Sequence, residues 1–99
     1  MSVMIEKPFR IQRPKVEIKM YFVSILYDKY ISWEFCLYIL MDVFHKDLEQ
    51  AKTITDVILS DGEAICGMYT FEIADTKATI VEQKANKEGF SLRCLIEEV

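Results

Sequence analysis

Residues 66–77 read CGMYTFEIADTK, and this stretch decides the fold. Apolar residues lead up to Thr70, which stands where a strand passes into a helix. Threonine is a preferred N-cap, and an acidic residue such as Glu72 in the first turn is favoured by the helix dipole. The stretch therefore predicts a strand over 64–69 and a helix that begins at Phe71.

The C-terminal third of the chain continues this pattern. The helix from Phe71 is predicted to run to Lys87, since Gly89 suits its termination. We expect its buried stripe to include Ile73, Lys77 by its aliphatic stem, Ile80 and Val81. A last strand over 91–97 alternates, with Leu92, Cys94 and Ile96 on one face.

Two helices are predicted upstream of the decisive stretch. Ser32 suits the N-cap of a helix over 33–44, whose expected inner stripe is Trp33, Leu37, Leu40, Met41 and Phe44. Asp47 and Gln50 have the spacing of a capping box, and Gly62 suits the left-handed end of that second helix. Its expected inner face is Leu48, Ala51, Ile54 or Thr55, and Ile58.

The N-terminal region divides into an arm and a first strand. Residues 1–15 contain Pro8 and Pro14 and no sustained period, which predicts an extended, flexible arm. From Val16 the sequence alternates and then becomes apolar on both faces, as a strand does when it enters a covered sheet. The order β-α-α-β-α-β predicts one small α/β (α+β) domain over 16–99, a three-stranded sheet covered by three helices.

Composition limits the function classes. The chain has 99 residues, of which 52% are hydrophobic and 28% charged, as in a globular domain. No uncharged apolar run approaches the ~18–20 residues that span a bilayer, and no secretory signal is recognisable, so we expect a cytoplasmic protein without a membrane partner. The net charge is −4, with +3 in residues 1–20 and therefore −7 in the rest, which disfavours nucleic acid binding.

Catalytic, metal and cofactor sites are not indicated. Cys36, Cys66 and Cys94 form no CxxC pair and lie among apolar neighbours, so we expect reduced, buried thiols. His45 is expected in an exposed loop. A Cys–His enzyme that used Cys36 would need this thiol exposed, which its apolar neighbours contradict. We therefore expect no enzyme, no metal and no cofactor.

The decisive stretch closely resembles the motif of the ClpS family, the adaptors of the Clp AAA+ proteases. Cys-Gly, an aromatic residue followed by Thr, then Glu and Thr-Lys recur there in this order. The resemblance spans residues 16–97 and implies the ClpS fold with its antiparallel sheet. It also implies docking on the N-terminal domain of a Clp unfoldase by Glu72 and Lys77, on a helix capped by Thr70. The family's arm reaches toward the unfoldase pore, which the resemblance implies for residues 1–15.

The resemblance further implies a pocket for the N-terminal residue of a protein substrate, the N-degron. In the family, an Asn-Asp-Asp run and a His hold the substrate's α-amino group, and apolar residues enclose a Leu, Phe, Tyr or Trp side chain. Here the run reads Tyr27, Asp28 and Lys29, and Leu59 stands at the His position. The family's Thr-Pro-Met stretch reads Ile31, Ser32 and Trp33, and the other walls are Cys36, Thr55, Ile58 and Leu92.

These departures predict weakened or altered recognition. A hydrogen bond to a charged group is worth roughly 1.5–3 kcal/mol, so two lost bonds would lower affinity on the order of 10²–10⁴. Lys29 adds repulsion, whereas Tyr27 still offers an acceptor and Asp28 a negative charge. Ordinary packing of Trp33 and its neighbours is the alternative interpretation. We therefore expect an adaptor that modulates which substrates a Clp protease degrades, or a binding module that competes for docking or delivers substrates through another signal.

Overall fold

The computed structural model describes residues 17–28 and 30–99. The predicted arm over 1–15, Val16 and Lys29 lie outside the described residues. The elements follow one another as β1 (Tyr21–Leu26), α2 (Trp33–Asp42), α3 (Leu48–Asp61), β2 (Glu63–Tyr69), α4 (Phe71–Lys87) and β3 (Arg93–Glu98). The predicted order β-α-α-β-α-β is confirmed.

The three strands form one antiparallel sheet in the order β2-β1-β3. β1 is the central strand, and its Val23 and Ile25 are fully buried against the helices. The residues between them, Phe22, Ser24 and Leu26, face the other side of the sheet, which carries the exposed Ile65 and Leu95, so the prediction of a strand covered on both faces is only half right. The register with β2 shifts between Val23 and Ser24, so Cys66 is an extra residue in β2 and forms a bulge.

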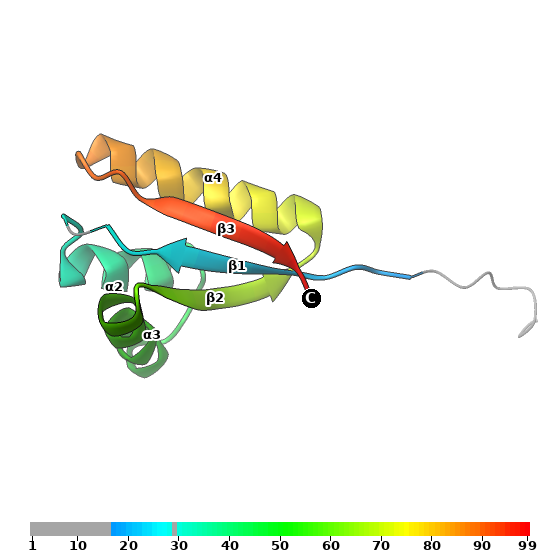
Figure 1. Ribbon diagram of the computed structural model, residues 1–99, viewed down its shortest axis with the longest axis horizontal. Helices are drawn as coiled ribbons and strands as arrows, with labels where there is room; N and C mark the ends of the chain where they lie inside the picture. Colours follow the sequence, from blue (N-terminus) through cyan, green and yellow to red (C-terminus); the bar gives the residue numbers. More distant parts are fainter. Residues whose placement is uncertain (1–16, 29) are drawn as a thin grey trace, which may run out of the picture.

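All three helices share one core with Val23 and Ile25 and so pack on the same face of the sheet. Figure 1 shows α4 lying along β3, whereas α2 and α3 lie together beside the other strands. The chain enters the sheet at the end where β1 begins and where β2 and β3 finish. At this end the Val99 amide donates to the Met20 carbonyl oxygen at 2.9 Å.

The predicted helix caps are confirmed for α2 and α3. The Ser32 hydroxyl accepts from the Phe35 amide at 3.1 Å. Asp47 and Gln50 form a reciprocal capping box, with the Gln50 amide donating to Asp47 Oδ1 at 2.8 Å. Gly62 ends α3 with φ of 91°, a left-handed conformation that glycine adopts without strain.

The predicted inner faces are only partly right. In α4 the buried stripe is Ala74, Ala78, Val81 and Ala85, and Ile73 is 49% exposed. Small side chains let the helix axis approach the sheet closely, so the larger isoleucine turns outward. In α2, Met41 is exposed and the buried residues are Phe35, Cys36, Ile39 and Leu40; in α3, Leu48 is exposed and Thr55 takes the inner position.

Candidate functional site

The junction between β2 and α4 depends on one close approach. A Cβ atom placed on Gly67 would lie 2.6 Å from Cε2 and Cζ of Tyr69, because the tyrosine ring lies over the glycine. No side chain other than hydrogen fits there while the ring keeps its place. The ring also packs near Phe44, with a centroid separation of 6.4 Å, so Gly67 lets an aromatic residue join the sheet to the end of α2.

The Lys77 side chain is half-buried at this junction rather than fully exposed to solvent. Its Nζ donates a 2.6 Å hydrogen bond to the Val43 carbonyl oxygen and lies 5.2 Å from the centre of the Tyr69 ring. Val43 is the C-cap of α2, where carbonyl groups lack helical partners and carry partial negative charge. The ammonium group has three N–H donors, and this bond uses one of them.

Glu72 is exposed in the first turn of the same helix. At 3.6 residues per turn, Glu72 and Lys77 lie about 140° apart around the α4 axis. Ile73, Thr76 and Ile80 occupy the surface between them. The acid and the base therefore flank a partly apolar strip, which we call the α4 strip: Glu72, Ile73, Thr76, Lys77 and Ile80.

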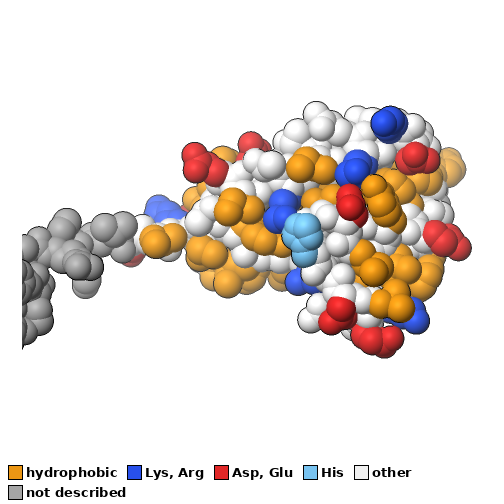
Figure 2. Space-filling model, turned by 180° about the vertical axis from the view of Figure 1, so that it is seen from behind, with side chains coloured by type: hydrophobic (Ala, Val, Ile, Leu, Met, Phe, Trp, Pro, Cys, Tyr) orange, Lys and Arg blue, Asp and Glu red, His pale blue; other side chains and the backbone are white. Residues whose placement is uncertain are grey.

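A hollow of about 310 Å³ lies beside the α4 strip. Its lining combines Ile73, Thr76, Lys77 and Ile80 with Asp42, Val43 and His45 from the end of α2 and the loop that follows. Figure 2 shows the histidine with hydrophobic and basic side chains beside it. His45 has φ of 56°, and this left-handed turn lets the Lys46 amide reach the Leu40 carbonyl oxygen at 3.0 Å.

Thr70 occupies the N-cap position of α4, as predicted, but its side chain does not cap. Its backbone is extended, with φ of −66° and ψ of 163°, and the structure gives it no side-chain hydrogen bond to the helix. The Thr70 carbonyl oxygen accepts the Ala74 amide at 2.9 Å, which starts the helical ladder. The start of α4 is therefore set by the backbone conformation of Thr70 and not by its hydroxyl group.

The predicted pocket residues separate into two groups. Tyr27 and Asp28 line an open hollow of about 600 Å³, together with Leu26, Ser91 and Arg93. Both Asp28 oxygens are engaged: Oδ1 accepts from the Tyr30 amide at 3.1 Å and Oδ2 from the Ser91 amide at 3.3 Å. This carboxylate ties the loop after β1 to the loop before β3. Arg93 brings a positive charge to the same hollow.

The other predicted walls are mostly core residues. Five of them are buried, namely Ile31, Cys36, Thr55, Ile58 and Leu92. Trp33 and Leu59 are half-buried, and the Trp33 indole Nε1 donates to Asp56 Oδ1 at 3.2 Å. This bond ties α2 to α3 directly beside two of the predicted walls, Thr55 and Leu59.

Thr55 carries a polar atom into this core. Its side chain is 0% exposed, and its Oγ1 has no hydrogen-bond partner among the residues that the structure describes. A buried hydroxyl without a partner costs on the order of 1–3 kcal/mol. The wall formed by α3 therefore holds an unused hydrogen-bonding group.

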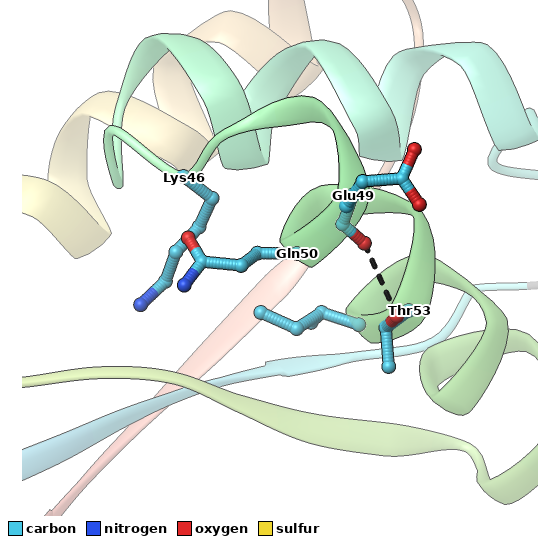
Figure 3. A pocket seen from close by; sticks show the side chains of 5 residues that line it. Lys46, Glu49, Gln50 and Thr53 are labelled. Atoms are coloured by element: carbon cyan, nitrogen blue, oxygen red, sulfur yellow. Dashed lines mark hydrogen bonds between the residues drawn. The ribbon is translucent and has the colours of Figure 1, made fainter.

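A third hollow, of about 330 Å³, lies on α3 away from both predicted groups. Figure 3 shows its lining side chains, Lys46, Glu49, Gln50 and Thr53, and the hydrogen bond that Thr53 Oγ1 donates to the Glu49 carbonyl oxygen at 3.1 Å. Ile54 completes the lining. None of the predicted site residues contributes to it.

The cysteine thiols are poorly suited to nucleophilic chemistry. Burial raises the pKa of the Cys36 thiol to about 11 and that of the Cys66 thiol to about 12. Burial, with Glu82 nearby, raises the pKa of Cys94 to about 12. All three thiols therefore stay protonated near neutral pH, which argues against the cysteine-enzyme interpretation.

Within residues 17–28 and 30–99, no group of three or more His, Cys, Asp or Glu side chains is arranged to hold a metal ion. No helix in the same ranges has the length and apolar content needed to cross a membrane.

Comparison with known proteins identifies the family. Residues 16–95 match the profile of the ATP-dependent Clp protease adaptor protein ClpS. The chain belongs to the ClpS family. The ClpS adapter of Nitratidesulfovibrio vulgaris strain DP4 is 43% identical over 98 residues, which cover 99% of this chain and 88% of the relative. The ClpS adapter of Helicobacter hepaticus is 43% identical over 83 residues, 84% of each chain.

A solved ClpS structure has the same fold. Agrobacterium tumefaciens ClpS2, bound to L-phenylalaninamide, superposes with a TM-score of 0.80 and 26% identity over 84% of this chain and 100% of that chain. The resemblance inferred from 66–77 is thereby confirmed, and so is the ClpS-like fold. The ClpS match makes this chain an adaptor of an ATP-dependent Clp protease.

Several residues of these sites escaped the sequence analysis of this ClpS chain. Ile73 was assigned to the core but is exposed, whereas Ile80 is half-buried against it, and Ala74, Ala78 and Ala85 offered a narrower apolar stripe at helical spacing. Val43 acts through a backbone carbonyl, for which the sequence carries no signal. Arg93 joins Asp28 only because β1 and β3 are neighbours, with Leu26 opposite Arg93.

Proposed function

We propose that this adaptor docks on the N-terminal domain of a Clp AAA+ unfoldase through the α4 strip and modulates which substrates the protease degrades. The supporting observation is the position of Ile73, 49% exposed between Glu72 and Lys77. An exposed apolar side chain flanked by opposite charges is typical of an interface, where apolar contact gives affinity and charges fix orientation. The hollow of about 310 Å³ beside it offers space for a partner side chain.

Lys77 is suited to this role because its position is already fixed. The bond to Val43 and the Tyr69 ring restrict the long side chain before any partner arrives. A partner carboxylate that meets a pre-positioned ammonium group avoids part of the ordering cost of a free lysine. Glu72, which is exposed, supplies the negative charge of the α4 strip.

Calorimetric titration of the unfoldase N-terminal domain with the full chain tests this proposal. Because Ile73 and Glu72 are exposed, Ile73→Asp and Glu72→Gln leave the fold intact, and we expect each to weaken binding at least tenfold. Val57→Asp, an exposed apolar residue on α3, is the matched control and keeps the wild-type affinity. Unchanged affinity in both α4 variants would remove the docking assignment.

The N-degron pocket is the second part of the proposal, in an altered form. The relative from A. tumefaciens holds L-phenylalaninamide, which has a free α-amino group and an aromatic side chain. This supports a pocket at the corresponding positions here, walled by Trp33, Ile58 and Leu92. The buried Thr55 hydroxyl, which has no hydrogen-bond partner among the described residues, also suits a wall that receives a ligand.

Amino-group recognition is the altered feature. Asp28 already accepts two backbone amides, and Arg93 lines the same hollow. Tyr27 and Leu59 stand where the family carries Asn and His. We therefore propose weak binding of peptides that begin with Leu, Phe, Tyr or Trp.

A non-delivering binding module is the second candidate, favoured by the engaged carboxylate of Asp28. Degradation assays with an N-degron reporter and an unrelated reporter separate the two functions. An adaptor redirects turnover from one reporter to the other, whereas a competitor for docking lowers only the turnover that depends on another adaptor.

A further inference from the structure

The sheet has an apolar face that the helices leave open. Residues on β1 alternate, so Phe22, Ser24 and Leu26 point away from the side that buries Val23 and Ile25. The register places Met68 and Glu97 beside Phe22, Ile65 and Leu95 beside Ser24, and Glu63 and Arg93 beside Leu26. We call these outward residues the open face.

The middle of the open face is hydrophobic and accessible. Ile65 is 53% exposed, Met68 49% and Leu95 39%. Ile65 and Leu95 flank the small side chain of Ser24, and Met68 lies opposite Phe22. Contiguous exposed apolar side chains of this kind mark interaction surfaces in soluble proteins. The α4 strip belongs to a helix packed on the other face, so the two surfaces are separate.

Part of the segment that precedes the sheet has one mainly apolar side. The odd positions hold Val3, Ile5, Phe9 and Ile11 with Lys7 among them, whereas the even positions are mixed: Met4, Glu6, Pro8 and Arg10. In an extended chain the odd-numbered side chains point to one side. We propose that residues 3–11 bind the open face, so that the chain's own N-terminal segment covers it.

The connecting chain is long enough for this return. The described chain starts at Glu17, four residues before β1, and Figure 1 shows this stretch leading away from the sheet. Residues 12–16 extended reach about 16–18 Å, which matches a return of about 13 Å past residues 17–20 combined with the rise of about 10 Å to a layer packed on a sheet. Residues 3–11 then span roughly 26 Å, more than the length of a six-residue strand. Pro14 lies in the connecting stretch and suits a reversal of direction.

Charge favours this occupant over an acidic partner. Residues 1–16 carry Lys7, Arg10, Arg13 and Lys15 against Glu6, a net charge of +3. The total of −4 therefore leaves −7 on residues 17–99. Glu63 and Glu97 border the open face, and Arg93 is the one base in its three rows. A tethered basic segment is attracted to this surface at a high effective concentration.

Paramagnetic relaxation in the full chain tests the proposal. A nitroxide is attached through Ser2→Cys, since Cys36 and Cys66 are buried, Cys94 is half-buried, and all three thiols are protonated at neutral pH and react slowly. We expect the amide signals of Ile65 and Leu95 to lose intensity several-fold more than those of Lys52 and Val57 on the outer side of α3. Equal losses on both surfaces would overturn the proposal.

Variants and a mixing experiment make the test specific. Ile65→Ser combined with Leu95→Ser changes exposed residues only, and we expect it to abolish the selective signal loss. Val57→Ser is the control and leaves it unchanged. If nitroxide-labelled chains cause the same loss in separate ¹⁵N-labelled chains, a second copy occupies the open face and the proposal is wrong.

Discussion

Lys77 and Val43 lie 34 residues apart in the chain and are joined by a 2.6 Å hydrogen bond between Nζ and a backbone carbonyl oxygen. The bond links α4 to the C-terminal end of α2, where an unpaired carbonyl group attracts a cation. The Tyr69 ring lies under the same ammonium group. One lysine thus stabilises the junction of two helices and a strand while its remaining donors face a hollow.

Replacing Lys77 by methionine tests the structural part of this role. Lys77→Met keeps the aliphatic stem and removes the hydrogen bond to a charged donor, so we expect the free energy of unfolding to fall by about 1.5–3 kcal/mol. Urea denaturation measures the change. Lys87→Met, at the exposed end of the same helix, is the control and changes stability by less than ~0.5 kcal/mol. A loss as small as that of the control would contradict the proposed anchoring.

Gly67 is predicted to be intolerant of alanine because of the Tyr69 ring. The added Cβ would lie 2.6 Å from two ring atoms, so the ring must leave its position over the strand and beside Phe44. We expect Gly67→Ala to cost about 1–3 kcal/mol of stability. In a Tyr69→Leu background the same change should cost markedly less, since the clashing ring is absent. Equal costs in the two backgrounds would show that the ring is not the cause.

Local signals in the sequence predicted the elements and most of their ends. Caps such as Ser32, Asp47 with Gln50, and Gly62 act within one turn of the chain, so the sequence around each was sufficient. The face that a helix buries depends instead on what it packs against. In α4 the narrow stripe around Ala74 and Val81 packs against the sheet, whereas Ile73 is exposed and Ile80 is only half-buried.

The candidate sites show the same limit. The motif predicts Glu72 and Lys77 as docking residues, whereas the half-buried state of Lys77 depends on the distant Val43. Tyr27 and Asp28 were predicted in the pocket, but Arg93 and Ser91 reach the same hollow through strand pairing. Trp33 was predicted as a wall of the pocket, but its bond to Asp56 joins two helices whose relative placement the sequence does not specify.

Restoring the family residues is predicted to strengthen the binding of N-terminal residues. Tyr27→Asn with Leu59→His adds two hydrogen-bonding groups at the positions that hold the substrate's α-amino group in the family. At roughly 1.5–3 kcal/mol each, they should tighten binding of a Phe- or Leu-initiated peptide at least tenfold. Fluorescence of Trp33, the only tryptophan, reports the binding. An N-acetylated peptide is the control, and tight α-amino-dependent binding by the unmodified chain would contradict the proposed alteration.

The buried thiols predict a loss of stability in alkaline solution. Burial raises the pKa of Cys36 from 9.0 to about 11 and that of Cys66 from 9.0 to about 12. Above pH 9 the unfolded chain releases these protons while the folded chain retains them, so the unfolded state is favoured as the pH rises. Below pH 9 both states keep the thiols protonated, and this contribution to stability is fully present.

The slope with pH separates the thiols from other titrating groups. In reducing buffer, the free energy of unfolding should fall between pH 9 and 11 by up to about 1.4 kcal/mol per pH unit for each thiol. Cys66→Ala lowers stability at every pH because it leaves a small cavity, but its slope should be shallower than that of the wild type by that one contribution. Urea denaturation at half-unit steps of pH measures both slopes. Parallel curves would mean that the Cys66 thiol ionises equally in the folded and unfolded chains.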